Sequence, residues 1–145
     1  YKVSPPLRTK TDVEALIQGL KDGVIDAVVS QHTPQEIEFK NVEFHIAKNG
    51  ITGLQTALPM ALKAGLTAEQ IVEKFAIGPR NVVNMPVPYL SVGENANLVV
   101  FDVQESWTFD TTTNKSKCKN NPLFGQKVVG KVKLVVNNNQ LIVNN

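Results

Sequence analysis

A short apolar segment that runs directly into a polar elbow is the feature that most constrains how this chain can fold. Residues 26–35 read DAVVSQHTPQ, so an apolar stretch is followed by a histidine, a proline and two glutamines. Barrels and open sheets of the α/β class place their active sites at the carboxyl ends of buried strands. The sequence therefore predicts an α/β fold, a strand at residues 27–29 and a functional site at the elbow.

Helices are predicted on both sides of this elbow. Residues 11–22 predict a helix that is capped by its first residue and ended by the glycine that follows. Residues 52–64 predict a second helix, residues 67–70 form a capping box that opens a third, and a helical turn is expected from residue 78. The apolar residues expected to face a core are Val13, Leu16, Ile17, Leu20, Leu54, Leu58, Ala61, Leu62, Ile71, Val72 and Phe75.

The composition changes after Pro86 and Pro88, which is the one internal boundary that the sequence indicates. Residues 97–103 and 130–143 are rich in valine and leucine and predict strands. The three asparagines at residues 137–139 suit a hairpin turn, because asparagine tolerates positive φ. We therefore expect two parts, residues 1–86 and residues 87–145, with β-strands in the second.

Five motifs in the order of the chain resemble the dihydroorotases, which are zinc-dependent cyclic amidohydrolases of the amidohydrolase superfamily. The elbow QHTPQ is similar to the D-H-A-P-H signature of that family. The other four motifs are VSPPLR at residues 3–8, GLQTALP at residues 53–59, GENANLVVFD at residues 93–102, and NPLFG at residues 121–125 followed by GKV. Dihydroorotases close and open the dihydroorotate ring in pyrimidine biosynthesis, and the resemblance implies this class of reaction.

The resemblance also implies the architecture. Residues 1–86 would be the C-terminal portion of a TIM-type (β/α)8 barrel, and residues 87–145 would be strands of a small accessory β-sandwich. A barrel needs about 250 residues, so we expect the chain of 145 residues to be a segment of a longer one. The family's H-x-H motif and remaining zinc ligands would lie outside it, and no residue here is assigned to a metal. His32 and His45 are interpreted as structural or surface histidines.

At the elbow, this sequence departs from the family pattern in ways that concern catalysis. Gln31 occupies the position of the family's aspartate, which handles the proton of the zinc-bound water. Gln35 replaces a histidine that contacts substrate, and Ser4 replaces a residue that helps hold the substrate carboxylate. Asn49 and Gly50 match substrate-binding positions of the family. At these positions the side chain is altered here or the main chain makes the contact. Because an amide accepts no proton near neutral pH, Gln31 is not expected to act as a base.

Three interpretations of function remain open from the sequence. The first is a working zinc enzyme that acts on dihydroorotate or N-carbamoyl-aspartate, with another group in place of the missing base. The second is a non-catalytic homologue with a structural role, as a homo-oligomer or beside a carbamoyltransferase. The third is a stand-alone α/β domain whose resemblance is only ancestral. With the N-terminal half absent, the strands of the second part would have unpaired edges, which predicts a partner chain or poor solubility.

Charge and composition narrow the classes of partner. The net charge is +2, and the lysines of the C-terminal part are not accompanied by the arginine and aromatic residues typical of nucleic-acid binding. No run of about 18 apolar residues occurs, so no membrane span is expected. The single Cys118 fits a reducing compartment, and we expect a cytoplasmic protein.

Overall fold

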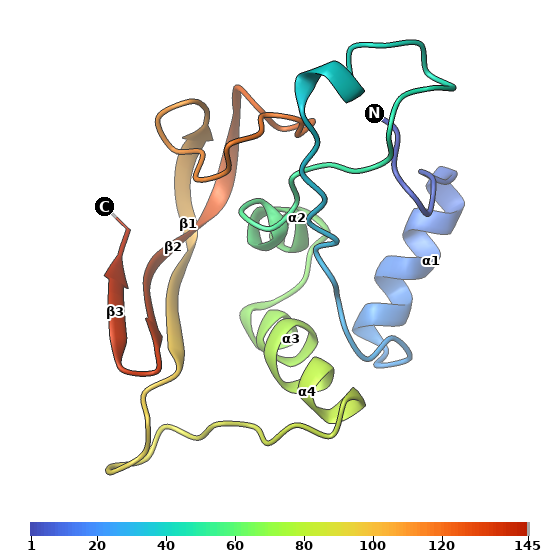
Figure 1. Ribbon diagram of the computed structural model, residues 1–145. Helices are drawn as coiled ribbons and strands as arrows, with labels where there is room; N and C mark the ends of the chain where they lie inside the picture. Colours follow the sequence, from blue (N-terminus) through green and yellow to red (C-terminus); the bar gives the residue numbers. More distant parts are fainter. Residues whose placement is uncertain (145) are drawn as a thin grey trace.

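The computed structural model describes residues 1–144 and places the helices on one side of an antiparallel sheet (Figure 1). Helix α1 lies farthest from the sheet, and the later helices lie between them. None of the described helices is long and apolar enough to cross a membrane. The elements are α1 (Lys10–Lys21), η1 (Ile37–Phe39), α2 (Ala57–Lys63), α3 (Ala68–Val72), η2 (Glu73–Ile77), α4 (Gly78–Val82), β1 (Leu98–Phe109), β2 (Gln126–Asn137) and β3 (Gln140–Val143).

The predicted first helix is confirmed as α1, but it begins two residues earlier than a cap at Thr11 would place it. Its N-cap is Thr9 rather than Thr11, and the Thr9 hydroxyl accepts a hydrogen bond from the Asp12 amide while the Asp12 carboxylate accepts from Thr9. This reciprocal pair satisfies amide groups that have no partner within the helix. The predicted apolar face is packed only in part: Leu20 packs against the core and Ile17 is half-buried, whereas Val13 and Leu16 are 45% and 54% exposed.

The prediction of a strand at residues 27–29 is wrong for the described part of the chain. Residues 26–31 have no strand assignment, and the only bridge nearby joins His32 to Ile51. The Val28 amide donates to the Lys74 carbonyl instead of to a neighbouring strand. A strand requires a paired neighbour, and no other segment of residues 1–144 runs beside residues 26–30 as a strand.

The helices after the elbow follow the prediction with two corrections. The capping box is confirmed, because Thr67 accepts from the Gln70 amide and Gln70 accepts from Thr67. Helices α3, η2 and α4 then run on without a break. Helix α2, however, begins five residues later than predicted, at Ala57 instead of residue 52, and Leu54 is 65% exposed. Val72, which was predicted to face a core, is 42% exposed.

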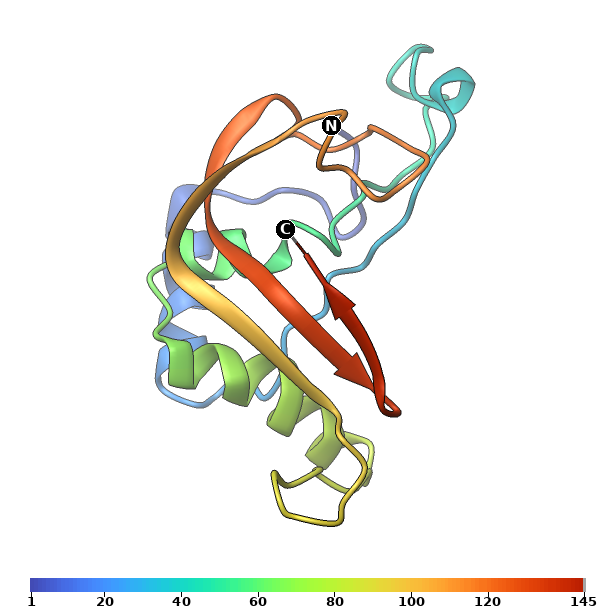
Figure 2. The ribbon, with the colours of Figure 1, turned by 90° about the vertical axis from the view of Figure 1, so that its left-hand side faces the viewer.

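The three strands form one antiparallel sheet in the order β1-β2-β3. The predicted hairpin is confirmed: Leu134 pairs with Val143, and Asn138 and Asn139 have φ values of 48° and 63°. Positive φ at both central residues is the requirement of a tight two-residue hairpin turn. Viewed from the sheet side, β1 and β2 form a long curved ribbon in front of the helices (Figure 2).

The core lies between the helices and the sheet. Ala61, Leu66 and Ile71 are buried together, and Phe101 of β1 packs against them. A second contact site surrounds Phe109, whose ring meets other aromatic rings edge to face. Trp107 contacts Phe109 edge to face, and its indole also donates to the Gly130 carbonyl at 2.8 Å. The helices and the sheet are therefore held together mainly by apolar contacts.

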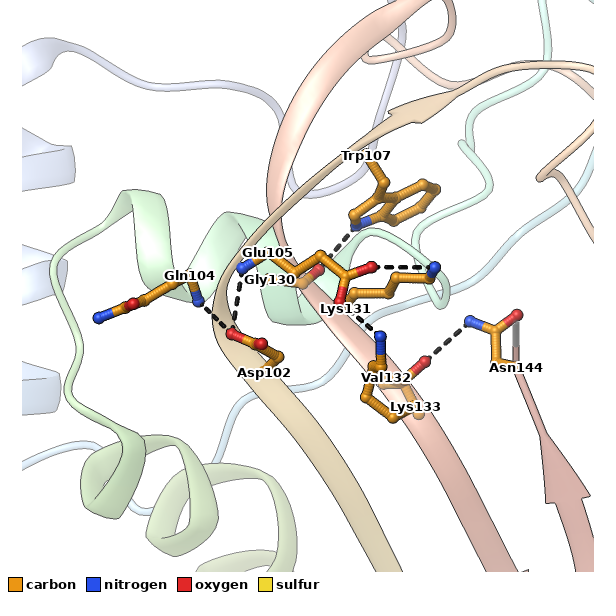
Figure 3. Close-up of polar contacts among 9 residues, drawn as sticks. All are labelled: Asp102, Gln104, Glu105, Trp107, Gly130, Lys131, Val132, Lys133 and Asn144. Atoms are coloured by element: carbon orange, nitrogen blue, oxygen red, sulfur yellow. Dashed lines mark hydrogen bonds and ion pairs between the residues drawn. The ribbon is translucent and has the colours of Figure 1, made fainter.

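A bulge interrupts β1 opposite Gly130, where residues 103–105 stand between the pairs Asp102↔Lys131 and Ser106↔Val129. The Asp102 carboxylate accepts from two amides of the bulge, and Glu105 forms ion pairs with Lys131 at 3.0 Å and Lys133 at 2.5 Å (Figure 3). Hydrogen bonds from Lys133 and then Lys131 hold the pKa of Glu105 below its ordinary value. Ion pairs from Glu105 thus connect the bulge to the neighbouring strand β2.

Candidate functional site

The elbow brings Gln31 and Ser4 together. The Gln31 side-chain amide donates to the Ser4 carbonyl at 2.8 Å, although these residues are far apart in the sequence. Gln31 itself has a φ of 44°, which is uncommon for a residue with a side chain. The Thr33 hydroxyl donates to the Gln31 carbonyl at 3.0 Å and helps to hold this conformation. The amide of Gln31 is therefore used as a donor that ties the elbow to the segment preceding α1.

The other three residues predicted for the site also lie together. The Gln35 side-chain amide donates to the Asn49 carbonyl at 3.1 Å, and the next residue, Gly50, is buried. Gly50 has a φ of 125°, and a Cβ there would stand 2.7 Å from Thr33. Only glycine fits this close approach. The structure thus forms two adjoining pairs, Ser4 with Gln31 and Gln35 with the segment at residues 49–50.

Two asparagines that the prediction did not include as site residues fasten this elbow. The Asn120 side chain donates to the Gly50 carbonyl at 3.2 Å and accepts from the Gln35 amide at 3.5 Å. Asn121 is only 1% exposed, and its amide donates to the Thr52 carbonyl and to the Thr56 hydroxyl. The sequence signal was the motif NPLFG at residues 121–125. That motif marks a turn, but its partners some 70 residues away appear only in the tertiary structure.

The two histidines differ in their surroundings. His32 accepts a hydrogen bond at Nδ1 from the Leu54 amide at 3.3 Å, so its proton is on Nε2 when the ring is neutral. His45 is exposed, and its main-chain carbonyl accepts from Lys2. Within residues 1–144, no three His, Cys, Asp or Glu side chains are grouped closely enough to hold a metal ion.

A cavity of about 1070 Å³ opens beside the elbow at Gln35. Its wall includes Phe44 and other apolar side chains, together with four lysines and two glutamates. Lys40 is one of these lysines, and its ammonium donates to the Lys48 and Gly50 carbonyls at 2.8 and 3.2 Å. The cavity is therefore of ligand size and carries an excess of positive charge.

Comparison with known proteins places this arrangement in a family. The profile of the Amidohydrolase family matches residues 4–141. The chain belongs to the amidohydrolase family. This amidohydrolase chain is 42% identical over 147 residues to a dihydroorotase of Acetivibrio thermocellus, which covers 98% of the chain and 34% of the relative. It is also 42% identical over 134 residues to a dihydroorotase of Ruminiclostridium cellulolyticum, and this match covers 89% of the chain and 31% of the relative. The predicted resemblance to dihydroorotases is confirmed.

Solved structures show the same fold. A D-hydantoinase (dihydropyrimidinase) from Thermus sp. matches with a TM-score of 0.85 at 26% identity, covering 99% of the amidohydrolase chain and 34% of that protein. An L-hydantoinase from Arthrobacter aurescens gives a TM-score of 0.86 at 29% identity, with the same coverage. The inactive dihydroorotase-like domain of a Chaetomium thermophilum multifunctional protein matches with a TM-score of 0.61 at 18% identity. The match covers 93% of this chain and 36% of that domain's chain, and it supports the fold alone. The chain spans about one third of the length of its curated relatives.

Proposed function

We propose that this chain is the C-terminal part of a dihydroorotase-type protein of pyrimidine biosynthesis. Residues 1–86 would contribute the last elements of an amidohydrolase barrel, and residues 87–145 would contribute strands to an accessory β-sandwich. Support comes from the match to about one third of each curated dihydroorotase and from the order of helices before an antiparallel sheet. We place the whole protein in the cytoplasm, and the free thiol of Cys118 in this chain supports a reducing compartment.

Within this protein, the elbow would be non-catalytic. The observation that carries this proposal is the hydrogen bond from the Gln31 amide to the Ser4 carbonyl at 2.8 Å. A general base must be able to accept a proton, and an amide that donates to a carbonyl has neither the basicity nor the free orientation for that role. Gln35 is used in the same way, as a donor to the Asn49 carbonyl. Both family positions would therefore stabilise the loop rather than act on substrate.

Zinc is the cofactor that the resemblance implies, and such a site needs about three or four protein ligands. The described residues do not fit the metal by themselves, because no suitable group of three ligands occurs among residues 1–144. Nor is an aspartate present at the elbow to assist it. Any zinc would depend on ligands from elsewhere in the protein, and we derive no step through it.

The role of such a homologue would be structural. It could form homo-oligomers or assemble with another enzyme of the pathway, such as a carbamoyltransferase. The exposed apolar residues of β3 support a covering partner or segment, since Leu141 and Ile142 are 61% and 65% exposed. Neither a nucleic acid nor a membrane is part of this proposal.

A second candidate is a working dihydroorotase that acts on dihydroorotate or N-carbamoyl-aspartate. The identity of 42% to a curated dihydroorotase over nearly the whole chain favours it. The full-length protein would then need a base from outside the elbow, because proton transfer to the leaving nitrogen is still required. The two candidates differ in whether Gln31 disables the reaction.

The deciding experiment measures dihydroorotate hydrolysis by the full-length protein, with zinc and after metal removal. We expect no metal-dependent turnover from the wild-type protein. The double variant Gln31→Asp with Gln35→His should gain zinc affinity or ring-opening activity if only the elbow has changed, whereas Gln104→Asp, at an exposed position of the β1 bulge, should gain neither. Metal-dependent turnover by the wild-type protein would refute the non-catalytic role.

A further inference from the structure

Residues 36–48 leave the elbow and return to it as one closed loop, which we call the strap. Its ends lie close together, because the Gln35 side chain before it donates to the Asn49 carbonyl after it at 3.1 Å. Within the strap, the Lys48 amide donates to the Phe39 carbonyl at 3.1 Å. The strap projects from the rest of the chain in Figure 2. Compact loops with closely spaced ends are frequently functional.

The strap has little apolar packing. Within residues 36–48 only Ala47 is buried, whereas Ile37, Phe44 and Ile46 are 73%, 70% and 60% exposed. Segments with few buried apolar contacts open locally at a lower free energy than the whole protein unfolds. The closed form of the strap therefore depends mainly on polar contacts.

The Lys40 ammonium is the group on which these polar contacts converge. It donates to the Lys48 carbonyl at 2.8 Å and to the Gly50 carbonyl at 3.2 Å, so it ties the middle of the strap to its end. The Gly50 carbonyl also accepts from the Asn120 side chain at 3.2 Å, and the Gly50 amide donates to the Lys2 carbonyl at 2.9 Å. Lys40 thus connects the strap to a residue that is held by two other segments of the chain.

Other contacts of the strap are weaker than those of Lys40. The Lys48 ammonium lies 3.7 Å from the centre of the Phe39 ring, which is 41% exposed. A cation–π contact at an exposed site contributes less than two hydrogen bonds from a charged donor. Among the described residues Lys40 forms no ion pair, so its charge serves the two carbonyls.

We infer that the strap opens and closes as a unit and that the Lys40 ammonium holds it closed. The strap forms part of the wall of the cavity beside the elbow, through Ile37, Val42 and Phe44. Residues 117–120 form another part of that wall. Release of Lys40 would therefore change access to the cavity while the helices and the sheet stay folded. This inference goes beyond the proposed function and holds whether or not the elbow is catalytic.

The substitution Lys40→Met in the full-length protein tests this inference. Methionine keeps an apolar side chain of similar length and removes the donors. Trypsin cleaves after Lys48 only when the strap is open, so the cleavage rate reports the open population. We expect this rate, followed by mass spectrometry, to rise about tenfold or more, because each hydrogen bond from a charged group is worth at least that factor in an equilibrium. The thermal midpoint should change by less than about 2 °C, because the opening is local.

Two control variants accompany this test. Lys40→Arg keeps a charged donor and should be cleaved at nearly the wild-type rate. Lys119→Met, at an exposed lysine in another part of the cavity wall, should leave the rate unchanged. Equal rates for Lys40→Met and the wild-type protein would overturn the inference. A large fall in the thermal midpoint would also overturn it, since the strap would then open only with the whole protein.

Amide hydrogen exchange of the wild-type protein tests the inference without a substitution. The Ala47 and Lys48 amides donate within the strap, to the Glu43 and Phe39 carbonyls. Both should exchange at similar opening free energies and about tenfold or more faster than the Val135 amide of the paired sheet. Exchange as slow as that of the sheet would show that the strap does not open by itself. Neither readout involves hydrolysis, so the result is independent of the proposed function.

Discussion

The elbow and the segments packed against it are held by hydrogen bonds from amide side chains. Gln31 and Gln35 each donate to a main-chain carbonyl, and Asn120 and Asn121 do the same from a loop near the other end of the chain. A neutral amide can donate and accept at once, so it satisfies buried backbone groups without the desolvation cost of a charge. This use of amides at positions where relatives would carry an acid and a histidine is the residue-level basis of the proposed non-catalytic role.

The strongest prediction at this scale concerns Asn121. The substitution Asn121→Ala removes donors to the Thr52 carbonyl and the Thr56 hydroxyl and the acceptor of the Leu123 amide. Because these groups are left unsatisfied at a site that is 1% exposed, we expect a loss of about 3 kcal/mol in the free energy of unfolding, measured by urea denaturation. Asn41→Ala, at an exposed position, should change it by less than about 0.5 kcal/mol. Equal effects of the two substitutions would contradict this role.

At the scale of elements, the bulge in β1 is the feature that bends the sheet. Residues 103–105 leave the regular register, and Asp102 and Glu105 replace the lost ladder contacts with side-chain bonds (Figure 3). Bulges increase the local twist of a strand pair. The curved ribbon of β1 and β2 seen in Figure 2 is consistent with this, and it lets the sheet follow the helices behind it.

Glu105 gives this element a pH-dependent contribution to stability. Its pKa in the folded protein lies below the ordinary value of 4.5, through the hydrogen bonds from Lys133 and Lys131. A carboxyl with a lowered folded-state pKa stabilises the protein above its unfolded value, and this stabilisation disappears as the pH falls through the folded value. Glu105→Gln should therefore lower the thermal midpoint near neutral pH and converge with the wild-type protein in acid. A constant difference across that range would contradict the argument, and Glu94→Gln, at an exposed carboxylate, is the control.

Caps and turns could be predicted where residues adjacent in the sequence determine them. The capping box at Thr67 and the asparagine hairpin were predicted from a few adjacent residues, and both are confirmed. The start of α2 was wrong because Asn121 bonds the Thr52 carbonyl and the Thr56 hydroxyl, and no local pattern reveals these contacts. The strand at residues 27–29 was wrong because a strand depends on its neighbours.

The whole molecule exposes apolar surface on both of its sides. Val13 and Leu16 of α1 are 45% and 54% exposed, and the residues of β3 are all exposed. Val29 beside the elbow is 80% exposed. Large contiguous apolar patches usually mark interfaces. These surfaces fit a chain that spans about one third of its curated relatives.

Residues 1–145 produced alone should therefore bind more of a hydrophobic fluorescent dye, per chain, than the full-length protein does. They should also self-associate, as measured by sedimentation, because β3 offers an unpaired apolar edge. Ile142→Lys should reduce this association, while Thr111→Lys, at an exposed polar residue outside the strands, should not. Equal dye binding by the isolated chain and the full-length protein would show that these faces are not covered in the whole protein.

The sequence by itself determined the capping box at Thr67, the hairpin turn, the class of fold and the family, because these depend on residue order and local backbone preference. It also placed the candidate site at the elbow and named five of its residues. Only the tertiary structure decided where the amides of that site are directed and why Asn121 is buried. These features arise from contacts between residues tens of positions apart, and the free energy of such contacts depends on burial and geometry that local sequence does not specify.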